Sequence, residues 1–241
     1  MTRKAIVVGL AVLLAGGLGL ATWGCGKKEK AGSESETGRA TGETGEQTEP
    51  AKPDAGRTVT MNGRSVMQGW MKHWGFTWEG PVEKNGYFLD YKELDGNDIS
   101  PSFANNTEGL APGSVAFFKF CFVDFDGSNL SQREREVEKV IQTARDRGLR
   151  LIIGNALPMR KSDGSPEILN EYRQFNAFLQ QKARENQDVW VYDFYGVIAG
   201  GDGWLKPEYQ TEDSHPNDKA YAALDPSFLE LLGAVFAKQA K

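Results

Sequence analysis

The residues best suited to chemistry lie near the C-terminus of the chain, in the segment EDSHPN at 212–217. It contains one of the chain's two histidines, His215, with carboxylates two and three residues before it, Asp213 and Glu212. An imidazole that passes protons near neutral pH needs a carboxylate to fix its tautomer and to stabilise its charged form. The segment therefore predicts a general base if a nucleophile lies elsewhere, and an ordinary cap or surface histidine if none does.

A candidate nucleophile stands after the first predicted strand. Ser65 lies in the segment NGRSV at 62–66, between a short strand at 59–61 and a helix at 66–74. The free N–H groups of a helix N-terminus favour developing negative charge. Gly63 lets the backbone turn sharply and brings a reacting carbonyl close. Position alone favours a helix N-cap serine over a nucleophile.

Alternating strands and helices must position these two segments. Apolar runs rich in β-branched and aromatic residues predict buried strands, and charged periodic segments predict helices. The further strands are expected at 114–123, 149–156 and 188–194, and the further helices at 131–147, where Ser131 and Glu134 form a capping box, and at 165–186. Helices of this length between strands imply parallel crossovers and a three-layer α/β/α sandwich with a mostly parallel sheet. Ligands bind at the carboxyl ends of the strands in such a sheet.

Together the two segments resemble the SGNH/GDSL family of esterases and lipases, whose first block is Gly-Asp-Ser-x-x-x-Gly and whose last block is Asp-x-x-His-Pro-Asn. The matching residues are Gly63, Ser65, Gly69, His215, Pro216 and Asn217. The string FKFCFVDF at 118–125 resembles a phrase from a divergent bacterial branch of this family. The resemblance covers 57–241 and implies a flavodoxin-like sheet, with Ser65 as nucleophile and His215 as base.

The position of the triad acid departs from the family spacing. Counting three residues back from His215 reaches Glu212, whereas Asp213 is one residue nearer. A glutamate can do the same work with one more rotatable bond, and Asp213 would need a different turn. Glu212 is slightly favoured, and both residues stay open as the acid.

The oxyanion site departs further. The family's Gly-x-Asn-Asp block aligns with 121–124, where Asp124 matches but Cys121 replaces the Gly and Val123 replaces the Asn. Losing one oxyanion donor typically costs on the order of 10²–10³ in rate. The Ser65 backbone N–H and a polar loop at 105–106 are the expected substitutes. The family's second-block Gly has no clear match; Gly96 lies in the expected region, and a turn glycine explains it equally well.

Few other residues are candidates for binding a substrate or a metal. Trp204, in the Gly-rich loop 200–204, is a candidate wall of the substrate site. Asp124 and Asp126 are better explained by loop positioning and a turn than by a metal site. We expect no cofactor and no metal, and the net charge of −5 without basic clusters argues against nucleic acid.

The N-terminal part is expected to export and tether the domain. Arg3 and Lys4 precede an apolar run at 5–21, and Cys25 follows small residues, as in a bacterial lipoprotein signal at 1–25. An uncleaved anchor is the alternative. Residues 26–56 contain almost no large apolar side chain and are expected to form a flexible tether. Gly26 after the cysteine suggests sorting to an outer membrane.

Two functions follow from these expectations. The first is a membrane-tethered, monomeric serine esterase that faces the periplasm or cell surface and acts on a small-molecule or glycan ester, such as O-acetyl groups of a polysaccharide. The second is a catalytically impaired module on the same fold, which binds glycan or assists envelope polysaccharide assembly. Val123 at the family's Asn position is the feature that favours the second.

Overall fold

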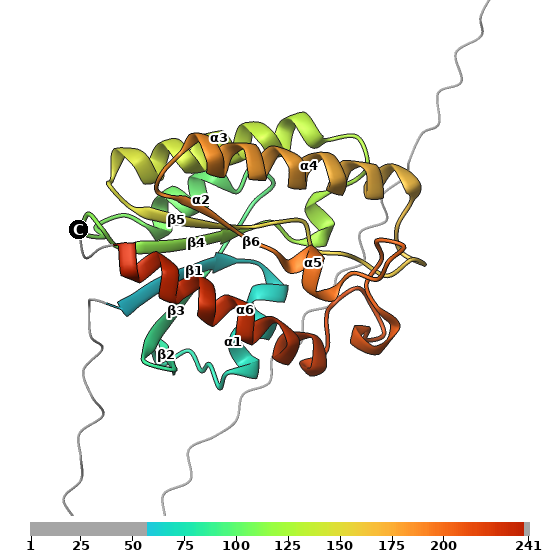
Figure 1. The fold of residues 1–241 in the computed structure, drawn as a ribbon, viewed down its shortest axis with the longest axis horizontal. Coiled ribbons are helices and arrows are strands. Elements are labelled where there is room, and N and C mark those ends of the chain that lie inside the picture. Colours follow the sequence, from blue (N-terminus) through green and yellow to red (C-terminus); the bar gives the residue numbers. More distant parts are fainter. Residues whose placement is uncertain (1–56, 239–241) are drawn as a thin grey trace, which may run out of the picture. The chain divides into compact units, whose positions relative to one another are not determined.

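The structure, a computed structural model, describes residues 57–238 of the chain. Six strands form one sheet in the order β2-β3-β1-β4-β5-β6 (Figure 1). All neighbouring pairs are parallel except β2 with β3. The strands are β1 (Thr58–Gly63), β2 (Val82–Lys84), β3 (Tyr87–Glu93), β4 (Val115–Lys119), β5 (Arg150–Gly154) and β6 (Val189–Tyr192).

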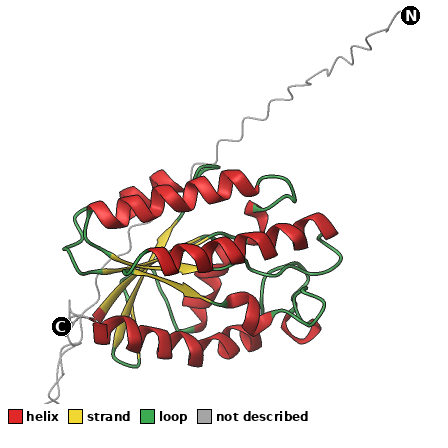
Figure 2. Cartoon of the chain, turned by 45° about the horizontal axis from the view of Figure 1, so that its top comes forward, coloured by secondary structure: helices red, strands yellow, loops and turns green. Residues whose placement is uncertain are grey.

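Helices cover both faces of the sheet (Figure 2). The helices are α1 (Ser65–His73), α2 (Ser100–Asn106), α3 (Leu130–Asp146), α4 (Pro166–Glu185), α5 (Phe194–Ile198) and α6 (Asp218–Ala237), with 3₁₀ turns η2 (Phe122–Asp124) and η3 (Pro207–Tyr209). Helices α2, α3 and α4 lie on one face, and α1, α5 and α6 lie on the other (Figure 1). The predicted three-layer α/β/α sandwich is therefore confirmed.

Each face has its own apolar core. The strand β4 is buried at every position, and successive side chains alternate between the two layers. Val115 and Phe117 join the core under α1 and α6, whereas Ala116 and Phe118 join the core under α3 and α4. Burial on both sides explains why this strand has a continuous apolar sequence rather than an alternating one.

Helix α6 is the one helix in the described part of the chain that is long and apolar enough to cross a membrane. Its buried side chains, including Leu224, Phe228 and Leu232, pack in the same core as Val59 and Met61 of β1. That packing accounts for its apolar composition within this domain.

The predicted elements agree with the structure in type, with two wrong details. The strand expected at 114–123 ends at Lys119, and its last residues enter the 3₁₀ turn η2. Helix α3 begins at Leu130 after Asn129, which makes no side-chain cap hydrogen bond, so the predicted capping box of Ser131 and Glu134 does not start the helix. The sequence patterns predicted no element at β2, β3, α2, α5 or α6. Strand β3 mixes buried and partly exposed positions next to the sheet edge, which gives it no continuous apolar run.

Candidate active site

The sheet topology predicts a ligand site at the carboxyl ends of the strands. Without β2, the order β3-β1-β4-β5-β6 is the flavodoxin-like order, and the chain reverses direction across the sheet between β1 and β4. Ligands bind outside the carboxyl ends of the strands at such a switch point. Ser65 follows β1, and the turn η2 follows β4, so both lie at this point.

Ser65, His215 and Asp213 form one hydrogen-bonded chain. The Ser65 Oγ lies 2.8 Å from His215 Nε2, although the two residues are 150 positions apart. His215 Nδ1 lies 2.9 Å from Asp213 Oδ2. Ser65 is exposed and the His215 ring is partly exposed, so a substrate can reach both. The arrangement has the geometry of a serine hydrolase triad, in which such groups serve as nucleophile, base and orienting carboxylate.

The electrostatics of Asp213 set the tautomer of His215. Asp213 accepts hydrogen bonds from the backbone N–H of His215 at 2.8 Å and from the Thr211 hydroxyl at 2.9 Å. The His215 backbone and ring N–H groups hold the pKa of the Asp213 carboxyl down, from its ordinary 3.8 to about 2. An ionised carboxylate can only accept, so Nδ1 carries the ring proton. Nε2 is then free to accept the Ser65 hydroxyl proton.

The slight preference for Glu212 as the acid is wrong in this structure. The Asp213 carboxylate contacts the ring, whereas the hydrogen bond made by Glu212 uses its backbone carbonyl, which accepts from Arg160. Asp213 reaches the imidazole from two residues upstream because the same carboxylate also accepts the His215 N–H, which closes a tight turn.

The residues after His215 anchor its loop to α6. Asn217 is the N-cap of α6, and its Oδ1 accepts from the N–H of Lys219 at 3.0 Å and of Ala220 at 3.2 Å. Its Nδ2 donates to the carbonyl oxygens of Glu208 at 2.9 Å and Gln210 at 3.2 Å. One side chain thus starts the helix and holds the incoming loop, which places His215 two residues before the N-cap of α6.

The two glycines around Ser65 are explained by close packing. A Cβ atom on Gly63 would lie 2.5 Å from Met67 Cβ. A Cβ atom on Gly69 would lie 2.3 Å from the hydroxyl oxygen of Tyr221 in α6. Gly69 therefore lets α1 approach α6, the helix that follows His215. The Gly63 carbonyl oxygen accepts from the Leu94 N–H at 3.1 Å and from the Tyr91 hydroxyl at 3.3 Å, and the expected contact of Gly63 with substrate stays a prediction.

Arg64 links the loops that follow three strands. It stands where the family has an Asp, and its Nε lies 3.2 Å from Oδ1 of Asp124. Its Nη2 donates to the carbonyl oxygen of Gly96, in the turn after β3. Asp124 also accepts the Cys121 N–H at 2.6 Å. Gly96 and Asp124 therefore do lie near the Ser65 loop, where they hold the backbone in place.

The oxyanion side of the site lacks the family's side-chain donor. Val123 is 65% exposed and apolar. Phe122 beside it packs edge-on against the His215 ring, with centroids 5.3 Å apart. Of the predicted substitutes, Asn106 donates to the carbonyl oxygen of Glu93 at 2.8 Å, and Asn105 is exposed on α2. Ser65 is the first residue of α1, so its N–H has no intrahelical partner and remains the available donor.

The predicted role of Trp204 as a substrate wall is wrong. Trp204 is 7% exposed and belongs to the core under α3 and α4. A Cβ atom on Gly164 would lie 2.3 Å from the Trp204 ring, so the indole fills space against that loop. A large aromatic residue in a Gly-rich loop is packed inward here because small neighbours leave room for it. Cys25, the predicted lipidation site, lies outside the described residues.

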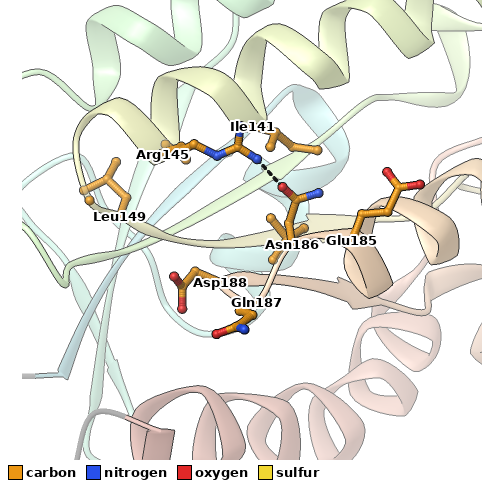
Figure 3. Close-up of a pocket in the computed structure, with 10 residues that line it drawn as sticks. Ile141, Arg145, Leu149, Glu185, Asn186, Gln187 and Asp188 are labelled. Atoms are coloured by element: carbon orange, nitrogen blue, oxygen red, sulfur yellow. Dashed lines mark hydrogen bonds between the residues drawn. The ribbon is translucent and has the colours of Figure 1, made fainter.

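A cavity of about 240 Å³ lies between α3 and α4, away from the triad (Figure 3). Its lining comes from the segments that precede β5 and β6, so it is at the amino ends of these strands. Arg145 donates to the Asn186 side chain across it. None of the triad residues lines this cavity.

Sequence reasoning missed the residues that support the triad. Thr211 donates to Asp213, and Arg64 joins three loops. Arg64 had a readable signal, because a basic residue replaces the family's Asp beside Ser65 while Asp124 is retained in the third block. Thr211, two residues before Asp213, belongs to no motif, and only folding brings Arg160 of the loop between β5 and α4 to the loop of His215.

Exchanging the acid separates the two candidates. Replacing Asp213 by Asn keeps the size but favours the wrong imidazole tautomer, and we expect kcat for an activated acetyl ester to fall by about 10⁴-fold. Glu212→Gln is the matched control and should change kcat less than about twofold. Steady-state kinetics of the two variants checks this. The opposite ranking would return the acid role to Glu212.

The depressed pKa of Asp213 predicts a pH-dependent contribution to stability. Because the folded pKa is about 2 and the ordinary value is 3.8, the contribution is present above pH 3.8 and is lost as the pH falls towards 2. Asp213→Asn should therefore lower the thermal midpoint at pH 6, and the difference from the unsubstituted protein should shrink between pH 4 and pH 2. Calorimetry across this range measures it. A difference that is independent of pH would contradict the assignment.

Comparisons with known proteins support the fold. No protein-family model and no curated protein matches the chain. Among solved structures it is similar to a GDSL-like lipase from Bacteroides thetaiotaomicron (TM-score 0.56, 15% identity, 74% of this chain and 89% of that chain). It is also similar to a serine-to-alanine variant of an acetyl esterase solved with an acetate ion (TM-score 0.53, 14% identity, 74% and 99%). The C-terminal domain of the Oskar protein of Drosophila is a third (TM-score 0.52, 13% identity, 76% and 94%). The chain thus has an SGNH hydrolase-like α/β fold, which proteins named as hydrolases share with one that is not.

Proposed function

We propose that this chain is a serine esterase with Ser65 as nucleophile, His215 as general base and acid, and Asp213 as the orienting carboxylate. The observation that carries the proposal is the unbroken Ser65–His215–Asp213 hydrogen-bond chain, with contacts of 2.8 Å and 2.9 Å. These three groups sit at the switch point where this class of sheet binds ligands. The fold neighbours named as lipase and acetyl esterase agree with it.

The geometry supports a two-step acyl transfer. Ser65 Oγ attacks the ester carbonyl carbon while His215 Nε2 takes the hydroxyl proton, and Asp213 stabilises the imidazolium. The tetrahedral intermediate then collapses, and the imidazolium gives its proton to the departing alkoxide. Water, deprotonated by the same nitrogen, attacks the acyl-serine and releases the acid. Ser65 ends each cycle protonated, so no cofactor is needed.

The oxyanion is served by the backbone N–H of Ser65 in this proposal. It stands at the N-terminus of α1, whose helix dipole favours negative charge. Val123 cannot supply the second donor of the family pattern. Because one donor is worth on the order of 10²–10³ in rate, we propose a slow esterase.

The proposed substrate is a short acyl ester, with O-acetyl groups of an envelope or extracellular polysaccharide as the native class. The acetyl esterase among the fold neighbours was solved with an acetate ion, which supports a small acyl group. An exposed Ser65 suits an ester carried on a large polymer, because the chain of a glycan can pass over an open surface. Trp204 is buried, so it does not support a glycan substrate.

We further propose that the protein is exported and held at a membrane through a lipid on Cys25. This rests on the sequence, in which a basic start and an apolar run precede the cysteine. Residues 26–56 would then separate the esterase domain from the bilayer.

The second candidate is a binding module that has lost catalysis. The exposed Val123 supports it, because an apolar side chain occupies the place of a donor. The similarity to the Oskar domain shows that the fold is not confined to proteins named as hydrolases. In this case the carboxyl ends of the strands around Ser65 would bind a glycan without cleaving an ester.

Removing the nucleophile or the base tests the esterase directly. Ser65→Ala and His215→Ala should each reduce hydrolysis of 4-nitrophenyl acetate by at least about 10³-fold, because each triad member is needed for the same step. Ser131→Ala, at an exposed position of α3, serves as the control and should keep full activity. Hydrolysis that survives both triad substitutions would refute the triad.

Restoring the missing donor tests the oxyanion argument. Val123→Asn should raise kcat by on the order of 10-fold or more, because one oxyanion donor is worth up to about 10³ in rate. Val123→Leu is the apolar control and should leave kcat unchanged. Because the side chain is exposed, neither change should shift the thermal midpoint appreciably. If Val123→Asn and Val123→Leu behave alike, position 123 has no role in the oxyanion site.

The tether is tested at Cys25. Cys25→Ser should abolish incorporation of radiolabelled palmitate and release the protein from washed membranes, because the thiol is the expected attachment point. Mass spectrometry of the mature N-terminus identifies the processing. Unchanged membrane retention with an uncleaved N-terminus would indicate a simple anchor instead.

A further inference from the structure

A clasp of charged and hydroxyl side chains holds the loop that carries Asp213 and His215. It consists of Arg160 and Asp163, in the loop between β5 and α4, together with Ser214. Arg160 donates from Nε and Nη2 to the two Asp163 oxygens, each at 2.9 Å. This paired geometry fixes the guanidinium plane far better than a single contact would.

The clasp grips the triad loop at both the backbone and a side chain. Arg160 Nη1 donates to the carbonyl oxygen of Glu212, and the Arg160 backbone N–H donates to Ser214 Oγ at 3.1 Å. The Ser214 hydroxyl donates in turn to Asp163 Oδ2 at 2.6 Å. The residues on either side of Asp213 are therefore both fixed by one loop.

This grip explains the unusual register of the acid. The carbonyl of Glu212 is turned towards Arg160, and Ser214 is 2% exposed and directed towards Asp163. With both neighbours held, the Asp213 side chain is left to face His215. Without these contacts the loop could turn the Glu212 side chain towards the His215 ring instead, because Glu212 stands three residues before His215, as the acid does in the family pattern.

We propose that Arg160 and Asp163 are positioning residues of the esterase, which hold Asp213 in register against the His215 ring. The inference rests on the proposed function, but the contact it concerns can be measured without catalysis. Neither residue touches the reacting atoms, so they act through Asp213.

The kinetic test breaks the clasp and asks whether its effect passes through Asp213. Arg160→Met should lower kcat for 4-nitrophenyl acetate about 10- to 100-fold with little change in KM, because small misplacements of a catalytic group cost up to about 10² in rate. In the Asp213→Asn background the same change should have almost no further effect. Losses that multiply independently would overturn the proposal. Asp163→Asn is the second variant and should behave like Arg160→Met.

Arg145→Met is the matched control. The Arg145 guanidinium also donates to a neighbouring side chain, that of Asn186. This contact lies beside the cavity at the amino ends of β5 and β6 (Figure 3). Substitution of Arg145 should leave kcat unchanged. An equal loss of kcat in the control would mean that the clasp variants act through general stability, which would contradict the proposal.

A second readout does not depend on activity. The chain has only two histidines, so the hydrogen-bonded Nδ1 proton of His215 can be assigned by proton NMR with His73→Gln as the reference. The downfield resonance should be present in the unsubstituted protein and in Arg145→Met, and lost or broadened in Arg160→Met. If the protein hydrolyses no ester but this pattern of resonances is seen, the positioning role of Arg160 and Asp163 is supported and the proposed esterase function is refuted. A resonance that persists in Arg160→Met overturns the clasp, whatever the activity.

Discussion

The close packing of α1 against α6 is the constraint on which the candidate site depends. Ser65 is the first residue of α1, and His215 lies just before α6, so the distance between nucleophile and base is set by how these helices meet. Gly69 permits the meeting, because any side chain there would collide with Tyr221. Asn217 then fixes the start of α6 and the loop leading to it. A contact between residues 150 positions apart thus follows from one small residue and one cap.

The charges around Ser65 are rearranged compared with the family pattern that the sequence resembles. An Arg occupies the motif position beside the nucleophile, and its ion pair with Asp124 joins the loops after β1 and β4. The same guanidinium donates to Gly96 after β3. In this arrangement Asp124 is committed to the scaffold, and Val123 leaves the oxyanion with a backbone donor. For the proposed esterase, this arrangement implies a complete proton relay and a weaker stabilisation of the transition state.

The sequence predicted the fold well because its buried strands are continuous apolar runs and its long helices are bounded by clear signals. Ser65 and His215 could be paired in advance, since parallel strands bring their carboxyl ends to one edge. Strand β3, next to the edge strand β2, could not be found, because partial exposure removes the apolar run. The slight preference for Glu212 over Asp213 was wrong because the facing side chain depends on a turn set by distant partners, Arg160 and Asp163. The prediction that Trp204 forms a wall of the substrate site was wrong because a Gly-rich loop can fold an aromatic residue inward as readily as outward.

Covalent labelling tests whether Ser65 is a nucleophile activated by His215. The domain 57–241 is treated with a fluorophosphonate, and peptide mass spectrometry locates the adduct. We expect one phosphonyl group per chain on Ser65, with labelling strongly slowed in His215→Ala. An unlabelled protein, or an adduct on another serine with Ser65 unmodified, would contradict it.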